Sequence, residues 1–269
     1  GRTNRRIPAA SGWPGHGDPG QPGPLEDNWA SMNQPEELAE ELLELGYHGM
    51  KLWSFDACYR RSGGQYVSAA DLREGLAPFE RIRDKVGDRI EVMLDGHGFF
   101  TMAAAVRIAD AMAPIKPLWL EDILRPDSLQ AMTEFRSRIS VPVAVSEMLV
   151  SADSYRQILN SGAADYAMID PTWVGGISAA VKLVDQAQIC NIPALMHDCT
   201  GPMTLLAGVN VALAGLMSML GPLWAGAVYD HVASSSPYWM GAMILCIACL
   251  LLARVKTQID QRTIWVSKF

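Results

Sequence analysis

Three acidic residues recur at an even spacing along the chain, and each ends a short apolar run. Asp95, Glu121 and Glu147 lie 26 residues apart, and the runs that they end are 90–95, 117–121 and 141–147. A strand, a loop, a helix and a second loop together take about this many residues, so the spacing predicts repeated β/α units. The strands of a parallel barrel all end at one mouth. We therefore expect the three carboxylates to meet there.

The same spacing continues further along the chain. Asp170 ends the run 167–170 and His197 ends the run 194–197, at intervals of 23 and 27 residues. Helices are predicted between the strands, at about 35–45, 68–87, 101–113, 127–138, 151–161 and 176–190. A strand is also expected at 49–53, and a weak edge strand at 6–10 precedes a Gly- and Pro-rich loop at 11–25. The predicted fold class is α/β, a TIM-type (β/α) barrel.

The expected cluster of carboxylates predicts a bound cation. Three carboxylates at one place repel one another unless a divalent cation neutralises them, and oxygen ligands of this kind suit Mg²⁺. Asp95, Glu121 and Glu147 are therefore candidate metal ligands. Any one of them alone would more commonly be a solvated loop acid or a helix cap. Their shared position at strand ends favours the metal site.

Composition limits the partners and the compartment. The net charge of −7 argues against a nucleic-acid partner. The chain has five cysteines, an odd number without framework spacing, which predicts a reducing, cytoplasmic environment for the barrel. A small molecule is the expected partner, and a homo-oligomer is compatible with the sequence.

Residues 1 to about 214 resemble the barrel of the enolase superfamily, within the mandelate racemase and muconate lactonizing enzyme group. The resemblance rests on six segments in order at barrel spacing, 49–51, 94–97, 119–122, 145–147, 170–176 and 197–202. Asp95-x-His97 and the segment 197–202 (His-Asp-Cys-Thr-Gly-Pro) are similar to those of acid-sugar dehydratases in that group.

The resemblance implies a role for seven residues. These are three Mg²⁺ ligands (Asp95, Glu121 and Glu147), an Asp–His dyad that serves as the base (Asp170 and His197), the first Lys of a Lys-x-Lys pair (Lys51) and a general acid (His97). Other interpretations remain open, since His197 could be a core histidine and Lys51 an exposed strand-end charge. The glycines beside His97 leave open that it only tolerates an unusual backbone angle.

Trp53 departs from the family pattern, because it stands where the second Lys would be. Racemisation needs proton transfer on both faces of the substrate, whereas dehydration proceeds with one base and one acid. Removing a proton beside a carboxylate builds up charge that Mg²⁺ and an ammonium group stabilise. The expected activity is therefore that of a Mg²⁺-dependent hydro-lyase acting on a sugar acid. An epimerase or cycloisomerase of the same superfamily is an alternative.

The barrel pattern stops near residue 214, before an eighth strand, and the capping domain that the family places before the barrel is also expected to be missing. No charged residue occurs in the 31 positions between Asp198 and Asp230, and 237–253 is a second apolar run. Segments 221–230 and 236–242 resemble the last two helices of a major-facilitator transporter. Residues 215–269 are thus predicted to be an apolar helical tail, with 215–253 either a membrane hairpin or buried helices.

A membrane-anchored or inactive remnant of the enzyme is the alternative function. A fusion, a rearranged gene or an assembly error would each explain the join.

Overall fold

The computed structural model describes residues 27–199, 201 and 203–215. The chain divides into two units, Gly1–Val211 and Ala212–Phe269, and the candidate site belongs to the first. The strand expected at 6–10, the loop at 11–25 and the apolar tail from residue 216 onward lie outside the described residues. In the part that is described, no helix has both the length and the apolar character needed to cross a membrane.

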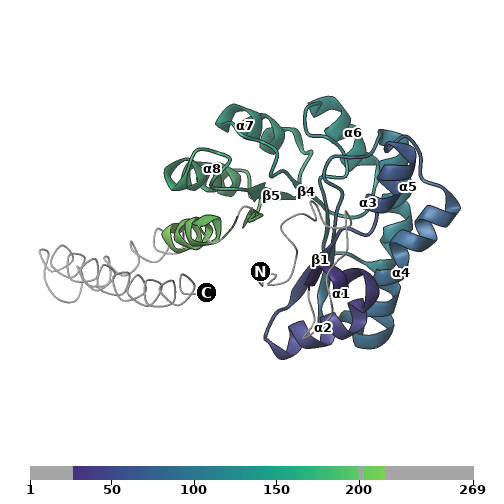
Figure 1. The fold of residues 1–269 in the computed structure, drawn as a ribbon. Helices are drawn as coiled ribbons and strands as arrows, with labels where there is room; N and C mark the ends of the chain where they lie inside the picture. The colour runs from purple at the N-terminus through teal and green to yellow at the C-terminus, as the bar shows by residue number, and fades with distance from the viewer. Residues whose placement is uncertain (1–26, 200, 202, 216–269) are drawn as a thin grey trace, which may run out of the picture. The chain divides into compact units, whose positions relative to one another are not determined.

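Six parallel strands form one sheet in sequence order, β1-β2-β3-β4-β5-β6. They are β1 Gly49–Leu52, β2 Glu91–Asp95, β3 Trp119–Glu121, β4 Val143–Val145, β5 Tyr166–Ile169 and β6 Ala194–Met196. The sheet curls into a half-barrel with helices along its outer side (Figure 1). This parallel α/β arrangement confirms the predicted fold class for the described strands, as an incomplete barrel.

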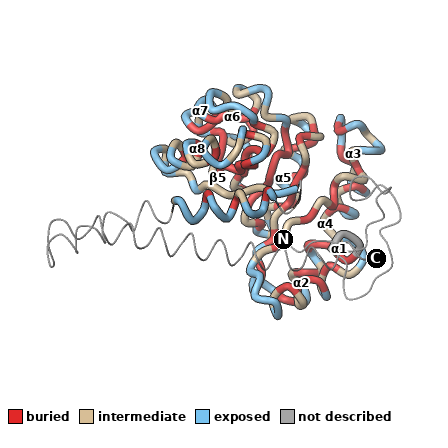
Figure 2. The backbone as a smooth tube through the Cα atoms, turned by 60° about the vertical axis from the view of Figure 1, so that its left-hand side comes forward, coloured by how far each residue is buried: buried red, intermediate tan, exposed pale blue. Residues whose placement is uncertain are grey.

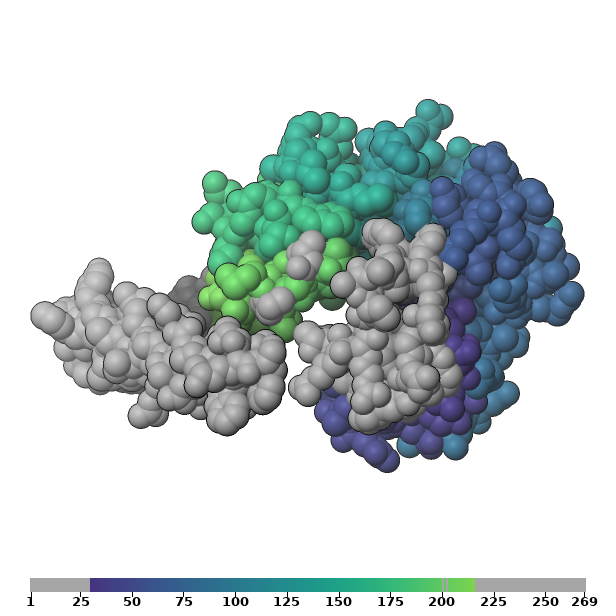
Figure 3. Space-filling view, viewed as in Figure 1, coloured from purple at the N-terminus to yellow at the C-terminus, as the bar shows by residue number. Residues whose placement is uncertain are grey.

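The helices follow the predicted alternation. They are α1 Asp27–Asn33, α2 Pro35–Glu44, α3 Asp56–Ser62, α4 Ala69–Val86, α5 Met102–Met112, α6 Leu129–Arg138, α7 Ala152–Ser161 and α8 Ile177–Ile189, and residues 203–215 are also helical. Consecutive β/α units lie side by side, so the colour in Figure 3 changes steadily from one end of the described chain to the other. Helices α1 and α3 were not predicted from the sequence.

Local signals explain where the long helix α4 begins and ends. The Ser68 hydroxyl accepts a hydrogen bond from the Asp71 backbone N–H, and the Asp71 carboxylate accepts one from the Ser68 backbone N–H. This reciprocal pair is a capping box, which satisfies two backbone donors that a helix start leaves unpaired. Gly87 ends the helix with a φ of 60°, a conformation that favours glycine.

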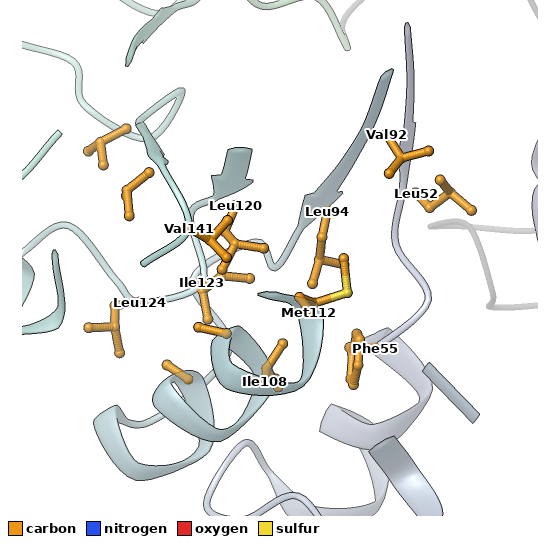
Figure 4. Close-up of a cluster of buried hydrophobic side chains, with 14 of the residues drawn as sticks. Leu52, Phe55, Val92, Leu94, Ile108, Met112, Leu120, Ile123, Leu124 and Val141 are labelled. Carbon is orange, nitrogen blue, oxygen red and sulfur yellow. The ribbon is translucent and has the colours of Figure 1, made fainter. Parts of the chain in front are cut away.

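One face of each strand packs against the helices. In a strand, successive side chains point to opposite faces, so alternate residues belong to one layer. Figure 4 shows this layer, in which side chains from strands β1 to β3 lie near Ile108 and Met112 of α5; the strand residues are Leu52, Val92, Leu94 and Leu120. Buried residues follow the strands and the inner sides of the helices, whereas exposed ones follow the outer sides (Figure 2). This layer is the main hydrophobic core.

The other face of each strand lies on the concave, inner side of the half-barrel. The alternation that sends Val92 and Leu94 to the core sends Met93 and Asp95 inward, and the same holds for Trp119 and Glu121 on β3. On this inner face, the residue nearest the carboxyl end of β2 and of β3 is acidic, and the residue two positions before it is apolar. This placement assembles the candidate site.

Candidate active site

A cavity of about 940 Å³ opens at the carboxyl ends of the strands. It is lined by residues from β1, β2, β3, β5 and β6, from the loops that follow strands and from the helix 203–215. These residues are Gly49, Lys51, Trp53, Met93, Asp95, His97, Trp119, Glu121, Glu147, Met168, Trp173, Leu195, Met196, His197, Asp198, Cys199 and Leu205. Six of the seven residues predicted from the sequence line it. The seventh, Asp170, is buried behind His197.

Lys51 lies between two of the predicted metal ligands. Its Nζ is 2.8 Å from Asp95 Oδ2 and 2.5 Å from Glu121 Oε1. Both carboxylates are almost completely buried, whereas about a quarter of the Lys51 side chain is exposed. Lys51 is therefore not an exposed strand-end charge, and its ammonium partly neutralises the carboxylates.

The pKa values show that negative charge exceeds positive charge in the cluster of Lys51, Asp95 and Glu121. Burial lowers the pKa of Lys51, but Asp95 and Glu121 outweigh that effect and raise it. Burial raises the pKa of Asp95, but Lys51 and His97 bring it below the usual range. Burial and the Asp95 charge raise the pKa of Glu121 to about 7. A single ammonium thus leaves negative charge at the site uncompensated.

Glu147 lies two residues beyond the end of β4, and the group of possible metal ligands that contains it holds Glu121 and His197 but not Asp95 among the described residues. The sequence placed it at the end of a strand spanning 141–147, but the pairing with the neighbouring strands stops at Val145. Its Oε2 atom is buried and finds no hydrogen-bond donor within the described residues. One ligand atom each from Glu121, Glu147 and His197 lies within 4.8 Å of the others. The two carboxylates of this group fit a hard divalent cation such as Mg²⁺, which prefers oxygen ligands.

Asp170 and His197 form the predicted dyad. His197 Nδ1 lies 2.9 Å from Asp170 Oδ2, and Asp170 is fully buried. The backbone N–H and the hydroxyl of Thr172 donate to Asp170 Oδ1, which holds the carboxylate in place. An Nδ1–H that donates to Asp170 leaves Nε2 as the proton acceptor. His197 also lines the cavity and is not part of the hydrophobic core clusters of the described residues.

His97 belongs to a second histidine–carboxylate pair. Its Nδ1 lies 3.3 Å from Asp56 Oδ1, and its Nε2 lies 3.8 Å from Asp95 Oδ2. Its φ of 50° agrees with the unusual backbone angle considered from the sequence. Burial lowers the pKa of His97, but the Asp56 hydrogen bond and the Asp95 charge outweigh it and raise the pKa. The Trp53 ring lies 5.6 Å from the His97 ring.

Two of these partners were missed in the sequence. Asp56 is in the unpredicted helix α3, and no spacing relates it to His97, 41 residues away. Trp119 sits on the inner face of β3, where its indole N–H donates to Glu121 Oε2 at 3.1 Å. The alternation of β3 could have placed Trp119 beside Glu121, since residues i and i+2 share a face.

Asp122 directly follows β3 and interacts with Glu147. It is fully buried, and Ser146 Oγ donates to its Oδ2 at 2.7 Å. Burial and the neighbouring Glu147 carboxylate raise the pKa of Asp122 well above its usual range. A protonated Asp122 beside Glu147 adds no further charge to the cluster.

Comparison with known proteins finds similarity to sugar-acid dehydratases. D-gluconate dehydratase from Thermoproteus tenax is 27% identical over 176 residues, covering 65% of this chain and 34% of the relative. D-xylonate dehydratase from Haloferax volcanii is 28% identical over 189 residues, covering 67% and 45%. The chain therefore spans between about a third and a half of the length of these relatives.

A solved structure is also similar. An enolase of the mandelate racemase subgroup from Agrobacterium tumefaciens is 39% identical with a TM-score of 0.65, covering 67% of this chain and 49% of that one. The transporter-like segments of the tail lie outside the described residues, and that resemblance stays a prediction. The profile of the family described as enolase C-terminal domain-like matches residues 34–233. By this match over most of its length, the chain belongs to the enolase C-terminal domain-like family of mandelate racemase and muconate lactonizing enzymes.

Proposed function

We propose that this chain carries the active site of a Mg²⁺-dependent hydro-lyase that removes water from a sugar acid. One observation carries the proposal. Two imidazoles, each paired with a carboxylate, line one cavity: His197 with Asp170 at 2.9 Å and His97 with Asp56 at 3.3 Å. Dehydration requires one group that takes a proton and another that gives one.

His197 is the proposed base. The Asp170 carboxylate accepts from Nδ1, so Nε2 takes the proton from the carbon next to the substrate carboxylate. Lys51 stabilises the negative charge that then develops on the substrate carboxylate oxygens. Asp95, Glu121 and Glu147 would hold Mg²⁺, which supplies further positive charge to those oxygens when bound.

His97 is the proposed acid. It protonates the hydroxyl on the neighbouring carbon as that group leaves as water, and Asp56 orients its ring. Trp53 lines the same cavity and is not a base, so proton abstraction from its side is not expected. This arrangement favours dehydration over epimerisation.

Related enzymes suggest the substrates to test. The relatives named above are dehydratases of D-gluconate and D-xylonate. The full chain should convert one of these or another aldonic acid, with Mg²⁺, to a 2-keto-3-deoxy acid that semicarbazide detects. His197→Asn should abolish this signal. Equal turnover in the variant would refute the role of His197. No turnover by the wild-type chain with any aldonic acid would favour the inactive remnant.

A further inference from the structure

A third potential ligand lies beside the Asp170–His197 dyad. Cys199 follows β6, and one ligand atom each from Asp170, His197 and Cys199 lies within 4.8 Å of the other two. Asp170 is buried, His197 is partly buried and Cys199 is exposed. An ion could therefore approach from the Cys199 side while the dyad stays anchored by Thr172.

The donor set differs from that of the carboxylate cluster. Sulfur, imidazole nitrogen and one carboxylate oxygen suit Zn²⁺, whereas Mg²⁺ prefers oxygen alone. Zinc sites with three protein ligands keep a fourth position for water. Ligand bonds of about 2.0–2.3 Å in a tetrahedron put the donor atoms about 3.5 Å apart.

We propose that Asp170, His197 and Cys199 form a binding site for Zn²⁺ or another thiophilic divalent cation, next to the carboxylate cluster and sharing only His197 with the ligand group of Glu121, Glu147 and His197. On binding, the Cys199 thiol releases its proton to solvent and the thiolate sulfur bonds to the metal. Burial and the Asp170 carboxylate raise the pKa of this thiol, so the cation has to displace a proton that is present at neutral pH.

Binding at this site has a consequence for the imidazole of His197. Asp170 Oδ2 faces Nδ1, so the cation bonds to Nδ1 and the ring proton moves from Nδ1 to Nε2, which then does not accept a proton from substrate. The cation therefore acts as an inhibitor, and this consequence, unlike the binding itself, rests on the proposed role of His197 as the base. Thiolate is a poor ligand for Mg²⁺, so Mg²⁺ does not compete well for Cys199.

Titration with Cd²⁺ tests the site without requiring turnover. The probe is the ultraviolet thiolate-to-cadmium charge-transfer band of the full chain in excess Mg²⁺. Every protein in the titration carries Ser at positions 246 and 249. Any thiolate band therefore comes from Cys58, Cys190 or Cys199. We expect one equivalent of Cd²⁺ to give the band. Cys199→Ser should lose it, and His197→Asn should weaken binding by at least about 10-fold.

Cys190→Ser is the matched control, because Cys190 Sγ lies 3.7 Å from Asn160 Oδ1 and Cys190 does not line the cavity. This variant should keep the band, and circular dichroism should show that all variants are folded. A band that persists in Cys199→Ser, or Cd²⁺ binding with no thiolate band, would overturn the proposal. Neither result would bear on dehydration, which the assay of His197→Asn tests separately.

Discussion

Asp170 Oδ2 lies 2.9 Å from His197 Nδ1, although 27 residues separate the two along the chain. The register of the sheet explains this contact. Ile169 of β5 pairs with Met196 of β6, so the residues that follow them emerge side by side at the carboxyl ends of two parallel strands. The dyad is therefore a product of strand register rather than of loop conformation.

Asp170→Asn tests the function of that contact. An amide can donate to Nδ1 and stabilise the wrong tautomer of His197, so we expect kcat to fall about 10²- to 10⁴-fold with a smaller change in KM. Steady-state kinetics of sugar-acid dehydration measures both. Asp185→Asn, at an exposed position of α8, is the control and should leave both constants unchanged. Equal kinetics for the two variants would argue against the dyad.

Lys51→Met should destabilise the metal-free protein at pH 8. The variant leaves Asp95 and Glu121 buried without their ammonium partner, and breaking such a buried pair typically costs about 3–5 kcal/mol. Urea unfolding followed by circular dichroism gives the free energy of unfolding. Lys182→Met, an exposed change in α8, should stay within about 0.5 kcal/mol of wild type. Equal stability of both variants would contradict the placement of Lys51.

The raised pKa of Glu121 predicts a pH dependence of stability. The carboxyl has a pKa of about 7 in the folded protein and about 4.5 as the ordinary value, so the folded state holds more protons between these values. Stability should therefore fall as the pH rises from about 4.5 to about 7. Thermal unfolding of wild type and Glu121→Gln across this range tests it. The variant should show a smaller decline, and parallel curves would exclude Glu121 as the cause.

Mg²⁺ should stabilise the protein more at pH 8 than at pH 5.5. At the lower pH the Glu121 carboxyl keeps its proton, which the cation has to displace. A cation at 100 times its Kd stabilises the folded state by about 2.7 kcal/mol. Differential scanning fluorimetry with and without Mg²⁺ measures the shift in Tm. Glu147→Gln should reduce the shift at pH 8, and an undiminished shift would place Mg²⁺ elsewhere.

The core layer between β2, β3 and α5 predicts a stability difference between two identical substitutions. Ile108 is fully buried in α5, whereas Ile189 at the end of α8 is 85% exposed. Ile108→Ala should lower the free energy of unfolding by about 2–5 kcal/mol. Ile189→Ala should change it by less than about 0.5 kcal/mol. Similar losses for both would show that α5 does not pack as Figure 4 depicts.

The sequence predicts the alternation of strands and helices well because each element carries a local signal. Ser68 and Asp71 mark the start of α4, and Asp95 and Glu121 are the last residues of β2 and β3. The sequence does not predict α3, since no apolar period distinguishes seven residues after a strand. Asp56 was missed for the same reason, because its contact with His97 depends on where α3 lies in space.

The roles of individual site residues follow less directly from the sequence. Spacing brings Asp95, Glu121 and Glu147 to one cavity, but only the structure shows that Lys51 bridges the first two. The sequence likewise gives no sign that the Glu147 Oε2 atom lacks a donor. Such contacts depend on side-chain rotamers, which the order of residues along a strand does not specify.

Exchange of the substrate proton with solvent tests the central claim most directly. The full chain, with Mg²⁺ in D₂O, is incubated with the sugar acid that it turns over, and proton NMR follows the signal of the carbon next to the carboxylate. His97→Asn should exchange this proton for deuterium while releasing little product, since the base remains and the acid is lost. His197→Asn should neither exchange nor dehydrate. Exchange that continues in His197→Asn would contradict the assignment of His197 as the base.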